Sequence, residues 1–201
     1  MREIQYQDFL KLLEIHKPAE IKREHIEIAK EEKPNTEPLV DIKANYPTIE
    51  STLTGGYILP TEMLPTPFIE RLINLGVGTR DIYHEQTRMI EHMIENAVLK
   101  GNNSDKNKKI YLLWHKCNNG KEIYIADQGD VEWDLDKVLA DNKKIQEQTG
   151  LDILFGRSEE FEYFKIKEVD EMKGTLLRIV LEKSEAKPCF YFGHKLFAKT
   201  T

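Results

Sequence analysis

Cysteine is scarce in this chain of 201 residues, and long hydrophobic runs are missing. Cys117 and Cys189 stand far apart, outside any CxxC or His-rich context, which argues against a disulfide framework or a structural zinc site. No apolar run reaches the roughly 18 residues that a membrane-spanning helix needs. Glu3 stands where a signal peptide would be basic and then apolar. We therefore expect a cytoplasmic protein with no membrane association.

The composition also lacks an excess of positive charge. The formal net charge is −6, with 40% hydrophobic and 32% charged residues, which is typical of a globular protein. Such a chain is poorly suited to coating nucleic acid, because phosphate affinity comes chiefly from Lys and Arg. Residues 66–120 are the exception, with eight basic and six acidic residues. This local excess indicates a directed contact with a polyanion.

The prolines divide the chain. Seven of the eight fall between Pro18 and Pro67, where they interrupt regular elements. We expect four regions: N-terminal helices over 1–33, a Pro/Gly-rich connector over 34–65, a helical domain over 66–150 and a small β-containing region over 151–201. The connector has room for a short strand near residues 57–59.

Apolar periodicity predicts a mainly α protein, a small helical bundle with a minor β element in the C-terminal quarter. Within the first region, Pro18 should end the first helix. Thr66 and Pro67 suit the start of a helix over 68–75. The strongest 3.6-residue repeat runs from Arg80 or Asp81 to Val98, and Gly101 stops it. Further predicted elements are helices over 110–117 and 131–148 and strands over 161–169, 175–181 and 190–197.

A Gly-x-Gly-x-Arg turn, Gly76 to Arg80, opens the long predicted helix. Glycines let backbone N–H groups approach a phosphate, and Arg80 would add a bidentate contact. The alternative is a plain interhelical turn with Arg80 paired to a nearby acid. No Walker Lys-Ser pair follows, so nucleotide hydrolysis has no support.

This turn and the segment Trp114 to Gly120 (WHKCNNG) carry a resemblance. Over roughly residues 66–148, the chain resembles the C-terminal helical domain found behind the catalytic domain of primases from phages, plasmids and mobile elements. Asp81 departs from the family, which often has Asn or His there. The resemblance implies an accessory module of DNA replication that contacts template or nucleotide, without the primase catalytic carboxylates.

Other candidate residues have ordinary structural explanations. A metal-binding pair on a helix needs two histidines four residues apart, but Arg88 stands four residues from both His84 and His92. We therefore expect these three residues to form a phosphate-facing or solvated polar face. The acidic residues at the start of the helix predicted over 131–148 suit a helix N-terminus or a basic partner, and they lack the calcium-loop pattern. Cys117 has no paired base, and both tryptophans suit a core. The acidic residues are Asp127, Asp130, Glu132, Asp134 and Asp136, and the tryptophans are Trp114 and Trp133.

We thus expect a non-catalytic module, without cofactor or metal, that contacts single-stranded or template DNA. Its proposed phosphate contacts are Arg80, Arg88, Lys106, Lys108 and Lys109, with Gly76 and Gly78 as the phosphate turn. A polymerase, helicase or host factor is the expected protein partner. The alternative is a protein-interaction factor, such as a phage-encoded inhibitor or adaptor, that acts through an acidic surface and the N-terminal helices.

Overall fold

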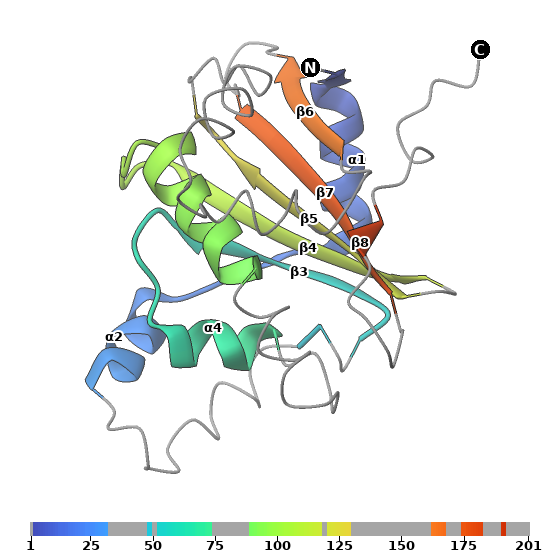
Figure 1. Cartoon of the computed structure of the whole chain (residues 1–201). Coiled ribbons are helices and arrows are strands. Elements are labelled where there is room, and N and C mark those ends of the chain that lie inside the picture. Colours follow the sequence, from blue (N-terminus) through green and yellow to red (C-terminus); the bar gives the residue numbers. More distant parts are fainter. Residues whose placement is uncertain are drawn as a thin grey trace, which may run out of the picture.

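A computed structural model describes residues 2–31, 48–49, 52–73, 89–117, 120–129, 162–167, 174–182 and 190–191. In this part of the chain, eight strands form one mixed sheet in the order β1-β6-β7-β5-β4-β3-β2, and β8 pairs with β7 (Figure 1). The strands are β1 Arg2–Gln5, β2 Ala19–Glu20, β3 Thr54–Pro60, β4 Lys109–Cys117, β5 Gly120–Asp127, β6 Glu162–Lys167, β7 Gly174–Glu182 and β8 Phe190–Tyr191.

The centre of the sheet is the antiparallel pair β4 and β5. Their register runs from Ile110 opposite Asp127 to Cys117 opposite Gly120. Side chains of a strand alternate between the two faces of the sheet, so Leu112 and Leu113 point to opposite sides. Both are fully buried. Each face of the central strands is therefore covered by other parts of the chain.

Helices cover both faces (Figure 1). On one face, α1 (Tyr6–His16) packs Phe9 and Leu12 against Leu113, Tyr124 and other apolar side chains of β4 to β7. The opposite face is covered by α2 (Arg23–Glu31), α4 (Thr66–Ile73) and the helical residues 89–101. The last five of these form a π-helix, η1 (Ala97–Gly101). Among the described residues, no helix combines the length and the apolar character that crossing a membrane requires.

The end of α1 illustrates how local sequence sets the geometry. Lys17 adopts a left-handed conformation, with φ 45°, and its N–H bonds to the Leu13 carbonyl at 2.8 Å. Such a residue satisfies the free carbonyls at a helix end, and Pro18 then prevents the helix from continuing. The chain turns directly into β2, which runs parallel to β3.

The predicted mainly α helical bundle is wrong, since the described residues form a mixed α/β fold built on a sheet. Residues 110–117 were assigned to a helix because Leu112, Leu113 and Trp114 are apolar, yet they lie in β4. An uninterrupted apolar run marks a strand buried on both faces as well as it marks a helix. The connector predicted over 34–65 includes β3, which is longer than the short strand expected near 57–59.

Several element predictions are confirmed. The helices on either side of Pro18, the helix that begins at Thr66 and the stop at Gly101 are all present. So are the strands β6 and β7 in the C-terminal region. The helix predicted over 131–148 lies outside the described residues. Each of the four regions predicted from the sequence contributes at least one strand to the sheet.

Burial on both faces of β4 makes a prediction. Leu112→Ala and Leu113→Ala should each lower the free energy of unfolding by about 2–5 kcal/mol, because each removes a buried side chain from a different core cluster. Urea denaturation measures both values, with exposed Glu14→Ala as a control within about 0.5 kcal/mol of wild type. A large loss of unfolding free energy for only one of the two leucines would contradict the burial of β4 on both faces.

Candidate functional site

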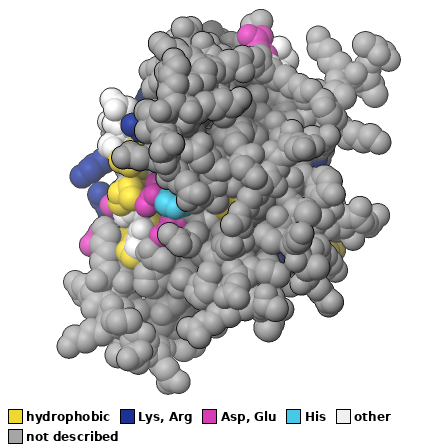
Figure 2. Space-filling view, viewed as in Figure 1, with side chains coloured by type: hydrophobic (Ala, Val, Ile, Leu, Met, Phe, Trp, Pro, Cys, Tyr) yellow, Lys and Arg dark blue, Asp and Glu magenta, His cyan; other side chains and the backbone are white. Residues whose placement is uncertain are grey.

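Part of the predicted phosphate site lies in the described residues. Gly76, Gly78, Arg80 and Arg88 fall outside them. The predicted lysines fall inside, at the point where the chain leaves η1, crosses an exposed loop and enters β4. We call Lys100, Lys106, Lys108 and Lys109 the lysine corner. Figure 2 shows Lys and Arg side chains at the left margin of the molecule, where Figure 1 draws this loop.

The loop of the lysine corner has a fixed backbone. The Asn102 N–H closes η1 through a 2.8 Å bond to the Ala97 carbonyl, and the Ser104 N–H bonds to the Val98 carbonyl at 2.8 Å. Asn103 and Ser104 adopt positive φ angles of 52° and 57°. Asparagine tolerates this conformation better than most residues. The turn that follows is closed by a 3.1 Å bond from the Lys108 N–H to the Asp105 carbonyl.

Asn102 holds the base of the loop, and its side chain is completely buried. Its amide nitrogen donates to the Thr61 hydroxyl at 2.7 Å and to the Lys109 carbonyl at 3.0 Å. Its oxygen accepts from the Gln128 N–H at 2.7 Å. One side chain thus ties together the residues that follow β3, begin β4 and follow β5. Buried polar groups that are satisfied in this way fix one geometry.

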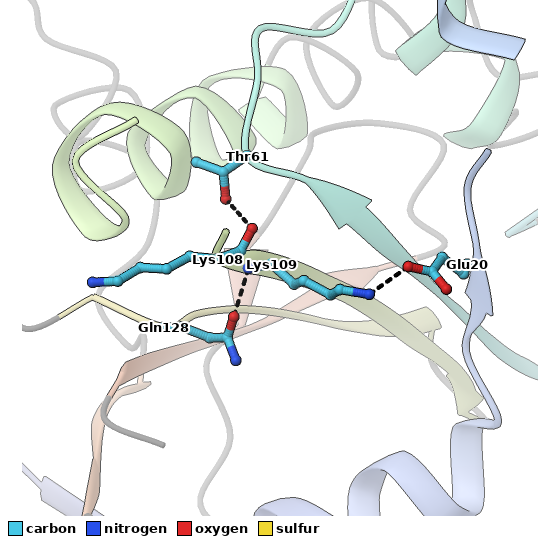
Figure 3. A network of polar contacts seen from close by, with 5 residues as sticks. All are labelled: Glu20, Thr61, Lys108, Lys109 and Gln128. Atoms are coloured by element: carbon cyan, nitrogen blue, oxygen red, sulfur yellow. Dashed lines mark hydrogen bonds and ion pairs between the residues drawn. The ribbon is translucent and has the colours of Figure 1, made fainter. Parts of the chain in front are cut away.

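Figure 3 shows the bonds around Lys108, just before β4, and Lys109, the first residue of β4. The Thr61 hydroxyl donates to the Lys108 carbonyl at 2.7 Å, and the Lys109 N–H donates to the Gln128 side chain at 2.5 Å. The Lys109 ammonium pairs with Glu20 of β2. Lys100 and Lys106 differ, since both are exposed and neither forms an ion pair with a described residue. These two lysines are therefore available to an external anion.

A buried carboxyl lies beneath the corner. Asp127 is only 6% exposed, and its carboxylate accepts hydrogen bonds from the Thr175 hydroxyl and from the Gly129 N–H, the latter at 2.9 Å. Burial raises the pKa of Asp127, although these hydrogen bonds act in the opposite direction. A side chain at Gly101 would collide with this carboxyl group. Asp127 therefore packs directly against the end of η1.

A second polar cluster lies on the opposite face of the sheet, under the end of α1. The Tyr124 hydroxyl donates to the Glu122 carboxylate at 2.7 Å, and Arg178 pairs with the other oxygen of the same carboxylate. The His16 ring meets the Tyr124 ring edge-on, with centroids 5.6 Å apart. All four side chains are buried, so we call them the buried cluster.

The charges of the buried cluster balance while His16 is neutral. Burial lowers the pKa of His16, and the nearby His115 lowers it further. The hydrogen bond to the Leu12 carbonyl and the charge of Glu122 act in the opposite direction, and the net shift is downward. Burial and the adjacent Glu122 raise the pKa of Tyr124, so its hydroxyl keeps its proton. The paired Glu122 and Arg178 then form a neutral unit. All four side chains are buried between α1 and the sheet, so this geometry is that of a structural contact between them.

The other candidates from the sequence have structural explanations where they are described. Trp114 is fully buried, which confirms it as core, and its indole N–H bonds to Thr52 at 3.0 Å. His92 pairs with Glu95 at 3.1 Å. Of the acidic residues considered for metal binding, Asp127 alone is described, and no group of three or more metal ligands occurs among the described residues. Cys117 ends β4, and His84 and Trp133 lie outside the described residues.

Sequence reasoning did not single out Asn102, Gln128 or the buried cluster. Two signals were present. Arg178 interrupts the apolar run Thr175 to Leu181, where an unpaired charge could not be buried. His16 follows Phe9 and Leu12 at helical spacing on the buried face of α1. For Asn102 there was no such signal, because two of its three partners, Thr61 and Gln128, come from distant parts of the chain.

The fold and its two polar sites define a mixed α/β protein with one sheet covered on both faces. No model of a known protein family matches the chain, and no curated protein matches its sequence.

Asn102→Ala should lower the free energy of unfolding by about 2–4 kcal/mol, because it leaves the Gln128 N–H and the Lys109 carbonyl without their buried partner. Thermal or urea unfolding measures the loss. Asn107→Ala is the matched control, since Asn107 is exposed in the same loop, and it should stay within about 0.5 kcal/mol of wild type. Equal effects of the two substitutions would contradict the role of Asn102.

The raised pKa of Asp127 predicts how stability depends on pH. The folded protein holds this proton more tightly than the unfolded chain, whose reference pKa is 3.8. Stability from this group is therefore greatest at low pH, and it is lost as pH rises from 3.8 through the raised folded value. Urea denaturation of wild type and Asp127→Asn across that range should show wild type losing stability relative to the variant. A constant difference between the two proteins would contradict the raised pKa.

Proposed function

We propose that this protein is a non-catalytic accessory module of DNA replication in a phage or mobile element, acting in the cytoplasm. It contacts phosphates of single-stranded or template DNA through the lysine corner. The observation that supports this most is the fixed loop after η1, which carries Lys100 and Lys106 at exposed positions, where neither pairs with an acid among the described residues. A fixed cationic loop loses little conformational entropy when it binds an anion.

The local charge balance favours a phosphate partner over a partner with a basic surface. Among the described residues, Glu20 and Asp105 within the corner and the buried Asp127 beneath it are the acids, against four lysines. Asp105 accepts the Asn107 N–H at 2.9 Å, so its carboxylate helps to shape the loop. The exposed Asn103, Ser104 and Asn107 add polar groups beside the cations. The sequence also predicts phosphate contacts by Arg80, Arg88 and the Gly76–Gly78 turn, which lie outside the described residues.

A second candidate function is docking on a protein partner such as a polymerase, helicase or host factor. Leu53 favours it, because its side chain is 72% exposed although its main chain is fixed by a 2.6 Å bond from the Lys116 N–H. An apolar side chain on a fixed backbone loses little conformational entropy when it is buried in a protein contact. The N-terminal helices fit this role less well than the sequence indicated. Both are packed into the core through Phe9, Leu12 and Ile26.

The DNA proposal is tested by fluorescence anisotropy of labelled single-stranded DNA over a series of salt concentrations. The Lys100→Ala/Lys106→Ala variant should bind more weakly than wild type. The slope of log affinity against log salt should be shallower by about 1.4, because each lost phosphate contact on a single strand contributes about 0.7.

The matched control is Lys11→Ala/Lys22→Ala, which changes the net charge equally at lysines that pair with Asp8 and Glu24. This control should keep the wild-type salt slope. Equal weakening by both variants would mean that net charge alone attracts DNA. A wild type that binds no DNA at low salt would end the proposal and leave protein docking.

A further inference from the structure

The contact between the end of α1 and the sheet is centred on a buried histidine. His16 is 5% exposed, in the last turn of α1, and its Nδ1 lies 2.7 Å from the Leu12 carbonyl. Because a carbonyl oxygen can only accept, Nδ1 carries the proton when the ring is neutral. The other nitrogen, Nε2, is buried and has no hydrogen-bond partner among the described residues.

We propose that this contact is a proton-sensitive latch, closed while the His16 imidazole is neutral and released when the ring takes up a proton. Release frees the C-terminal half of α1 and uncovers the apolar face of β4 and β5 around Leu113 and Tyr124. The latch lies apart from the DNA contact, because α1 packs on one face of the sheet and η1, which leads into the loop of the lysine corner, packs on the other.

The groups around the ring explain why a proton would open the latch. Protonation adds a positive charge and an N–H donor at Nε2. Glu122 of β5 is the nearby carboxylate, yet the Arg178 guanidinium of β7 already balances its charge, and its other oxygen accepts from Tyr124. His115 of β4, whose Nδ1 lies 3.1 Å from the Thr54 hydroxyl, contributes repulsion when it is charged. A buried charge without an acceptor is strongly unfavourable.

Two effects oppose release. The carbonyls at the C-terminus of α1 favour a positive charge, and so does Glu122. Burial and His115 outweigh them, since the pKa of His16 lies below its reference value of 6.5. The His16 ring therefore binds a proton more readily when α1 has opened than when α1 is packed on the sheet. The contribution to stability is complete above pH 6.5 and is lost as pH falls through the lowered pKa, and opening increases by up to about tenfold per pH unit in that interval.

Hydrogen exchange of the full chain, read by mass spectrometry at about pH 7.5 and about pH 5.5 and corrected for intrinsic rates, tests the latch. Peptides that cover Tyr6–His16 should lose protection at the lower pH in wild type and in His92→Asn, the control at a part-exposed histidine. His16→Phe keeps the ring volume and His16→Asn keeps a donor for the Leu12 carbonyl. Neither variant can titrate, so neither should show the loss.

Wild-type protection that does not change with pH would overturn the latch, and so would an equal loss in a His16 variant that folds. NMR titration of the histidine rings in wild type gives a reading that needs no variant. The latch requires the His16 ring to titrate below pH 6.5, and titration at or above that value overturns it.

Discussion

Burial of both faces of β4 and β5 is the constraint on which the rest of the structure depends. Side chains alternate along these strands between two separate core clusters, so neither strand can face solvent on either side. α1 must cover one face, and α2, α4 and the helical residues 89–101 must cover the other. The lysine corner and the buried cluster both follow from this arrangement, because each lies where a covering helix ends against the sheet.

Polar networks fix the two helix ends, and their pH responses have opposite signs. Asp127 supports the end of η1 and weakens the fold as pH rises, whereas His16 anchors the end of α1 and weakens it as pH falls. Glu122 and Arg178 are buried together, so removing either would leave the other charge uncompensated, at a cost of about 3–5 kcal/mol. These networks specify where each helix sits rather than add much net stability.

Local signals in the sequence predicted several helix boundaries and the strands β6 and β7, but not β4 and β5 at the centre of the sheet. Pro18, Thr66 and Gly101 each mark a boundary through a local effect on the backbone, and these boundaries are present in the structure. β4 was mistaken for a helix because an apolar run such as Leu112 to Trp114 fits both. Only pairing with β3 and β5, which is set by distant residues, decides between them. Charge alone singles out Lys106, Lys108 and Lys109 in the sequence as predicted phosphate contacts, but not Lys100. The Asn102 network that fixes their loop depends on three separate segments.

The central claim is that the fixed loop after η1 presents Lys100 and Lys106 to DNA phosphates. Covalent labelling of lysine amines, read residue by residue by mass spectrometry with and without single-stranded DNA, tests it most directly. The account predicts that DNA slows labelling of Lys100 and Lys106 and leaves Lys11 and Lys22, on α1 and just before α2, unchanged. Protection confined to other lysines, or equal protection of all of them, would contradict it.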